Sequence, residues 1–184
     1  MKTIYTCSSI LLLMMFGWAT AADTSTDAAP KPAQYLSEKA RAVNHRLLIG
    51  PQPQLNDFQG LKLGGVQRVI NFRTPDEMKK LPFRENEELA KLGIDYVEIP
   101  VGGSKYAYSP AQLKSLTEAL NGDEKTLLHC ASGQRASVIA VAYLVTEGGM
   151  SVNEAVQHAK GWWPLALQNV LGQELSLSIK TASD

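Results

Sequence analysis

The sequence predicts an α/β fold, with a single domain built on a mostly parallel central sheet that is flanked by helices. Two observations carry this prediction. Short apolar runs, typical of buried strands, alternate along the chain with longer segments of helical spacing. Most of the 184 residues remain after a short targeting segment, which is enough for one proper core. Strands that alternate with helices pair in parallel, so the loops that follow them meet at one edge of the sheet, where ligands of such folds bind.

The N-terminus has the pattern of a cleaved secretory signal. Lys2 is followed by an apolar run over residues 10–16, and Ala19-Thr20-Ala21 offers small residues for cleavage. No other stretch approaches the roughly 20 apolar residues that a membrane helix needs, so no stable membrane insertion is expected after cleavage. The protein is expected to be secreted, into the periplasm of a bacterium. The predicted organisation is a signal peptide over 1–21, a flexible leader over 22–34 and one domain over 35–180.

The composition narrows the partners and the chemistry. Eighteen basic side chains balance 18 acidic ones, so no basic bias points to a nucleic-acid partner. The two cysteines are Cys7, inside the predicted signal, and Cys130. A mature chain with one cysteine has no disulfide framework, and in an oxidising compartment its unpaired thiol is expected to be either buried or used in the chemistry.

The expected elements follow one another without long gaps. In chain order they are a short helix over 35–43, a strand over 46–49, a helix over 55–63, a strand over 66–72, a polar turn over 73–77, a helix over 85–92, a strand over 95–99, a helix over 111–120 capped by Ser109, a strand over 126–129, a helix from Arg135, a helix after Ser151 and a final helix over 162–179.

The turn after the last expected strand carries the clearest chemical signal. The apolar run over 126–129 ends at Cys130, Gly133 provides a flexible position, and Arg135 opens a helix. The N-terminus of a helix presents unpaired N–H groups and the positive end of its dipole, which favour a bound anion and a thiolate. Arg135 adds a cation with a planar set of donors. The turn therefore predicts a nucleophilic cysteine facing an oxyanion, against the alternative of a buried structural cysteine beside a surface arginine.

Three segments together resemble one bacterial family. They are Leu48-Ile49-Gly50-Pro51-Gln52-Pro53, Val69-Ile70-Asn71-Phe72-Arg73 and His129-Cys130-Ala131-Ser132-Gly133-Gln134-Arg135. In their order and spacing they look like the beta-lactamase-hydrolase-like or DUF442 phosphatase family, which is related to the dual-specificity cysteine phosphatases. The resemblance covers about residues 40 to 160 and implies a cysteine-phosphatase-like fold for the domain.

The resemblance also implies a mechanism. Cys130 would attack the phosphorus of a phosphate monoester to form a phosphocysteine, and Arg135 would clamp its equatorial oxygens. Backbone amides of the loop would hold the remaining oxygens, namely those of Ala131, Ser132, Gly133 and Gln134. The partner is therefore phosphate or another oxyanion, with no cofactor. No metal is expected either, since His45, His129 and His158 lack metal-ligand spacing. His129 either orients the loop or is a packed residue at the strand end.

Two departures from the phosphatase pattern keep other functions open. Four residues separate Cys130 from Arg135, one fewer than in the usual phosphatase loop. The same short spacing occurs in the DUF442 group and in rhodanese-like sulfurtransferases. The loop over 101–109, where related phosphatases carry an acidic general acid, contains no Asp or Glu. The alternatives are therefore a sulfurtransferase that carries a persulfide on Cys130, or a binding module that holds an oxyanion without turnover.

Two side chains after the second main strand could complete the site. Asp76 is a candidate general acid, against the alternative of a turn or cap residue. Arg73 is a candidate further contact for the anion, against that of a structural ion pair.

Overall fold

The computed structural model describes residues 34–160 and 164–172. The predicted signal peptide, the leader up to residue 33 and much of the predicted final helix lie outside these residues. In the part of the chain that is described, no helix is both long and apolar enough to cross a membrane.

Five strands form one sheet in the order β1-β2-β5-β3-β4. The strands β2 to β5 run parallel, and only the short β1 pairs antiparallel, with β2. The predicted fold class, a single α/β domain with a mostly parallel central sheet, is confirmed. The strands are β1 (Arg41–Ala42), β2 (Leu47–Gly50), β3 (Arg68–Asn71), β4 (Asp95–Glu98) and β5 (Thr126–His129).

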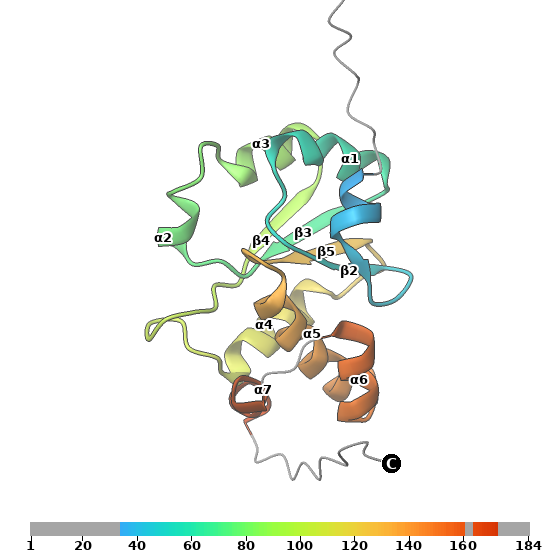
Figure 1. Cartoon of the computed structure of the whole chain (residues 1–184), viewed down its shortest axis with the longest axis vertical. Helices are drawn as coiled ribbons and strands as arrows, with labels where there is room; N and C mark the ends of the chain where they lie inside the picture. The colour runs from blue at the N-terminus through green and yellow to red at the C-terminus, as the bar shows by residue number, and fades with distance from the viewer. Residues whose placement is uncertain (1–33, 161–163, 173–184) are drawn as a thin grey trace, which may run out of the picture.

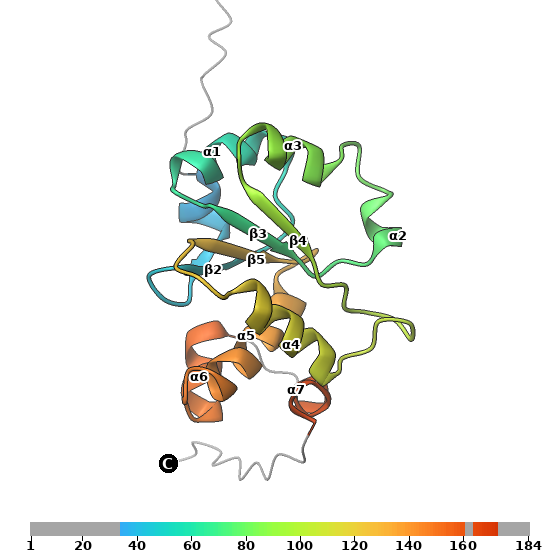
Figure 2. The same ribbon diagram turned by 180° about the vertical axis from the view of Figure 1, so that it is seen from behind.

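Helices cover both faces of this sheet (Figures 1 and 2). The π-helical turn η1 (Tyr35–Lys39), the 3₁₀ turn η2 (Leu55–Asp57), α1 (Phe58–Leu63) and α3 (Glu85–Lys91) belong to one side, and α4 (Pro110–Ala119), α5 (Gln134–Thr146), α6 (Val152–Ala159) and α7 (Pro164–Leu171) to the other. The short α2 (Pro75–Met78) stands apart, beyond the end of β3 (Figure 1).

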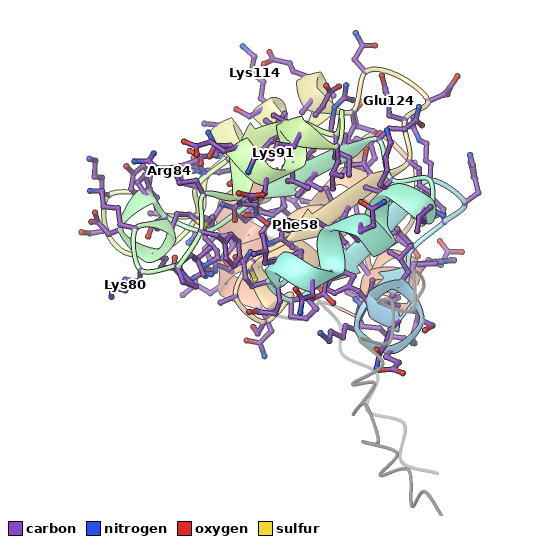
Figure 3. All side chains as sticks on the ribbon, turned by 90° about the horizontal axis from the view of Figure 1, so that it is seen from above. Phe58, Lys80, Arg84, Lys91, Lys114 and Glu124 are labelled. Carbon is purple, nitrogen blue, oxygen red and sulfur yellow. The ribbon has the colours of Figure 1, made fainter. Side chains whose placement is uncertain are left out.

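The strand side chains alternate between two cores, as the period of a β-strand requires. Leu47, Ile49 and Leu128 face the core that contains α5, whereas Leu48 and Leu127 face the core of α1 and α3. The second core also holds Phe58, which meets Phe83 edge to face at 5.6 Å between ring centroids. Figure 3 looks onto this side, where Phe58 lies over the sheet while Lys80 and Lys114 project from the rim.

The sequence prediction differs from the structure at two elements that bear on the site. The helix expected over 35–43 is wrong in its second half, because η1 ends at Lys39 and β1 follows it. The polar turn over 73–77 contains the helix α2, which the Thr74 capping box begins: the Thr74 amide donates to Glu77 Oε2 at 3.0 Å. This cap also fixes the position of the Glu77 carboxylate.

Candidate active site

The loops that follow β2, β3, β4 and β5 meet at one edge, because these strands end level with one another. Gly50 and Asn71 both lie opposite His129 in the parallel ladders. The connections continue beyond the strands: the Gln52 amide donates to the Ala131 carbonyl at 3.2 Å, and the Phe72 amide donates to the His129 carbonyl at 2.8 Å. Residues that are far apart in the sequence thus surround Cys130.

Cys130 lies between β5 and α5 and is only 1% exposed. Its Sγ accepts a hydrogen bond from the Gly133 amide at 3.1 Å. The amides of Ala131 and Ser132 donate to no protein acceptor among residues 34–160 and 164–172. Together with the N-terminus of α5, these unpaired donors suit an anion next to the sulfur, and the binding of an anion there stays a prediction. Gln134 is the first residue of that helix, so all four predicted loop residues lie at its start.

Gly133 adopts a conformation that only glycine takes without strain. Its φ is +90°, and a Cβ there would lie 3.2 Å from the Gly50 carbonyl oxygen. We expect Gly133→Ala to destabilise the fold by about 2 kcal/mol, through backbone strain and crowding, and to weaken anion binding.

Chemical denaturation of Gly133→Ala and Gly65→Ala measures this effect. Gly65 also has a positive φ, of +78°, but a Cβ there would meet nothing within 4 Å. The control variant Gly65→Ala therefore has the backbone strain of a positive φ but no steric clash at the new Cβ. Equal losses in both variants would show that the approach to Gly50 is unimportant.

Arg135 is held by Glu77 at the same edge. Its Nη1 and Nη2 donate to the two carboxylate oxygens of Glu77, each at 2.7 Å, and Nη1 also donates to the Val101 carbonyl at 2.7 Å. This bidentate pair occupies one edge of the guanidinium. The Cys130 side chain also contacts this guanidinium. The Glu77 carboxylate, and after it the Cys130 sulfur, raises the pKa of Arg135 against the lowering effect of burial.

Glu77 stays ionised in this arrangement. The hydrogen bonds from Arg135, and then those from Thr74, lower the pKa of Glu77 to about 2, against an ordinary value of 4.5. A carboxyl group whose pKa is lowered by folding stabilises the fold above its unfolded pKa, and this contribution is lost as the pH falls toward the folded pKa.

We therefore expect Glu77→Gln to lower the free energy of unfolding by about 1–2 kcal/mol at pH 7, a value reduced by solvent screening because the side chain is 30% exposed. The gap between the variant and the wild type closes between about pH 4.5 and pH 2. Urea unfolding at a series of pH values measures it. A gap that stays constant down to pH 2 contradicts the assignment.

A cavity of about 510 Å³ opens beside this ion pair. Its walls come from the β3–α2 loop, from the β4–α4 loop and from α5, and comprise Thr74, Asp76, Glu77, Gly102, Gly103, Ser104, Lys105, Tyr106 and Arg135. The cavity therefore reaches the guanidinium, whereas Cys130 is not among the residues that line it.

Asp76 lines the cavity, but its surroundings do not favour the protonated form that a general acid needs. Its side chain is 86% exposed and forms an ion pair with Lys79 at 3.0 Å. The hydrogen bond from Lys79 lowers the pKa of Asp76, which favours the ionised form. The assignment of Asp76 as general acid stays a prediction.

The guanidinium of Arg73 donates hydrogen bonds to neighbouring residues. Its Nη1 donates to Gln52 Oε1 at 2.7 Å, and its Nη2 donates to the Glu77 carbonyl at 3.3 Å. These contacts connect the β2 loop with α2, and a direct contact between Arg73 and an anion stays a prediction.

Sequence reasoning missed Glu77 as the partner of Arg135. The hydroxyl of Tyr108 also lies within reach of the charges of Arg135 and Cys130. That hydroxyl is buried and makes no hydrogen bond to the described residues. Burial raises the pKa of Tyr108 to about 12, with a smaller effect of the same sign from Cys130, so its proton is retained at neutral pH. The capping-box spacing of Thr74 and Glu77 was a usable signal for α2, whereas the partner of Arg135 depends on the tertiary fold.

Comparison with known proteins confirms the family resemblance. The chain is 30% identical over 125 residues to the beta-lactamase hydrolase-like protein of Xylella fastidiosa (strain Temecula1 / ATCC 700964), which is 65% of this chain and 28% of that protein. The chain thus spans less than a third of this curated relative. No protein-family profile matches the chain.

Several of the solved structures that resemble the chain are phosphatases by name. A candidate phosphatase of the DUF442 group from Shewanella putrefaciens CN-32 is 24% identical with a TM-score of 0.61, over 76% of this chain and 94% of that one. The active form of Tk-PTP is 21% identical with a TM-score of 0.61, over 73% of this chain and 95% of that one. At these identities the likeness shows the fold, which is that of the cysteine phosphatases.

Proposed function

We propose that the protein is a cysteine-dependent phosphatase that hydrolyses a phosphate monoester through a phosphocysteine intermediate. One observation carries the proposal: the Cys130 sulfur accepts a hydrogen bond from the Gly133 amide at the start of α5, beside the Arg135 guanidinium. A thiolate, inward amides and a planar pair of donors are what a tetrahedral oxyanion requires. The phosphatase names of the structural neighbours support the same reaction class.

The reaction follows from these positions in two steps. The Cys130 thiolate forms a bond to phosphorus while the bond to the leaving oxygen breaks, and that oxygen takes up a proton. Water then attacks the phosphocysteine, the S–P bond breaks, and inorganic phosphate leaves with regeneration of the thiolate. In both steps negative charge on the equatorial oxygens is met by Arg135 and by the loop amides, which are already oriented.

The leaving group decides which substrates react. The loop over 101–109 carries no carboxylic acid, and the exposed Asp76 is held ionised by Lys79. Proton donation to the leaving oxygen typically contributes about 10²- to 10⁴-fold. We therefore expect aryl phosphates with acidic phenols to react well and alkyl phosphates poorly.

The proposal is tested with reduced protein and a series of aryl phosphates between pH 5 and pH 9. Release of inorganic phosphate, with rates that fall steeply as the phenol becomes less acidic, supports it. Oxyanion binding measured by calorimetry, without turnover of any member of the series, contradicts it and favours a non-catalytic oxyanion-binding module.

Sulfur transfer is the second candidate, because four residues separate Cys130 from Arg135 and the loop is short. Here the Cys130 thiolate would take the outer sulfur of thiosulfate, release sulfite and pass the sulfur to a thiol acceptor. Intact mass after thiosulfate treatment separates the two reactions. One added sulfur on Cys130 supports sulfur transfer, and an unchanged mass with aryl phosphate turnover excludes it.

A further inference from the structure

A buried carboxylate and a buried imidazole lie beneath the Cys130 loop and have no part in the steps above. Glu85 opens α3, and His129 ends β5, directly before Cys130. Both side chains are 0% exposed, and Glu85 Oε1 lies 3.4 Å from His129 Nε2. Neither ring nitrogen of His129 makes a hydrogen bond to the described residues, so the carboxylate is the group that faces Nε2.

Gln52 connects the same carboxylate to the other side of the cysteine. Its Nε2 donates to Glu85 Oε1 at 3.0 Å, while its backbone amide donates to the Ala131 carbonyl at 3.2 Å. Glu85 thus contacts His129, the residue before Cys130, directly. It is connected to Ala131, the residue after Cys130, through Gln52.

The second carboxylate oxygen is also approached by a polar group. Tyr96 lies with its hydroxyl 3.4 Å from Glu85 Oε2 and accepts a hydrogen bond from Asn71 Nδ2 at 2.9 Å. Burial, and then the charge of Glu85, raises the pKa of Tyr96. Burying a carboxylate costs several kcal/mol even when it is paired, and an apolar group of similar volume often costs less. The presence of a carboxylate at this buried position therefore indicates a use for it.

We propose that Glu85 is a positioning residue for Cys130. It holds the His129 ring on one side and, through Gln52, the Ala131 carbonyl on the other, so that the sulfur stays beneath the amides at the start of α5.

The ionisable groups around the thiol are then Arg135 from α5, Tyr108 from the β4–α4 loop, Tyr35 from η1 and the Glu85–His129 pair. The effect expected on kcat for a phosphate ester rests on the proposed function, whereas the effect expected on the reactivity of the Cys130 thiol does not.

The direction in which the alkylation profile of Cys130 shifts in Glu85→Gln separates this proposal from a direct effect of charge. Removing a negative charge near a thiolate would by itself make the thiol easier to ionise. If Glu85 acts by positioning the loop, Glu85→Gln has the opposite effect, because the sulfur loses the arrangement that stabilises its anion. The rate of alkylation of Cys130 by iodoacetamide is therefore measured against pH, with the label quantified on the peptide that contains Cys130.

For Glu85→Gln we expect the midpoint of the alkylation profile to move to higher pH, and kcat for an aryl phosphate to fall roughly tenfold or more with KM within about threefold. Glu87→Gln is the control, because Glu87 lies on the same helix with its side chain 59% exposed and pairs only with Arg84 among the described residues. It should leave both quantities unchanged.

Glu85→Asp provides a second variant if the glutamine protein does not fold. It keeps the charge but withdraws it from His129 by about one bond length, so the positioning role predicts an upward shift here too. A midpoint that stays in place or falls in the folded variant overturns the proposal, even where stability drops. If the wild type turns over no phosphate ester, the alkylation midpoint still decides the role of Glu85.

Discussion

Cys130→Ser is expected to abolish aryl phosphate hydrolysis, with kcat reduced by at least about 10⁴-fold. A serine hydroxyl is a much weaker nucleophile than a cysteine thiolate in the same place. The side chain is 1% exposed and the exchange replaces sulfur by a smaller oxygen, so the fold should lose no more than about 1 kcal/mol. The rate measured in steady state, with unfolding followed in urea, separates chemistry from stability.

Oxyanion binding provides the control for this variant. The substitution leaves the amides of Ala131 and Ser132 and the Arg135 guanidinium in the protein, so inorganic phosphate should bind the serine variant within a fewfold of its affinity for the wild type. Rapid acid quench of the wild type with labelled substrate should leave phosphate on the peptide that contains Cys130. Hydrolysis that survives in the serine variant would rule out the phosphocysteine route.

How much of this site the sequence reveals depends on how local each feature is. The turn at Cys130 is readable because strand, loop and helix follow one another within a few residues, and the apolar run over 126–129 marks a strand buried on both faces. The two-residue β1 has no periodicity to detect, and it forms because its residues meet β2 in the folded chain.

The partners of the site residues are less accessible for the same physical reason. Glu77 and Arg135 are 58 positions apart, and their bidentate contact exists only because β3 and β5 are neighbours in the sheet. Glu85, as the first residue of α3 in an acidic stretch, has the pattern of a solvent-exposed side chain, yet it is 2% exposed. Burial of a charged group is visible only once the tertiary structure places a partner such as His129 against it.

Arg135→Lys is expected to reduce kcat/KM for aryl phosphates by about 10²- to 10³-fold, although it retains the positive charge. In the proposed mechanism the planar guanidinium binds Glu77 and the oxyanion at the same time, because it has several donors. An ammonium group is a single point of charge, and the Glu77 carboxylate and the Val101 carbonyl would both compete for it. The loss should therefore come from geometry and not from the net charge of the site. Steady-state rates under subsaturating substrate measure it directly.

Arg68→Lys is the matched control for this substitution. Arg68 also bridges carboxylates, those of Asp95 and Glu124, but it begins β3 and so lies at the opposite edge of the sheet from Cys130. It should change stability by no more than about 1 kcal/mol and leave kcat/KM unaltered. If Arg135→Lys instead retains the wild-type rate, the arginine serves only as the structural partner of Glu77, and the anion is held by the loop amides alone. If Arg135 binds both Glu77 and the anion, kcat/KM should fall far more in Arg135→Lys than in Arg68→Lys.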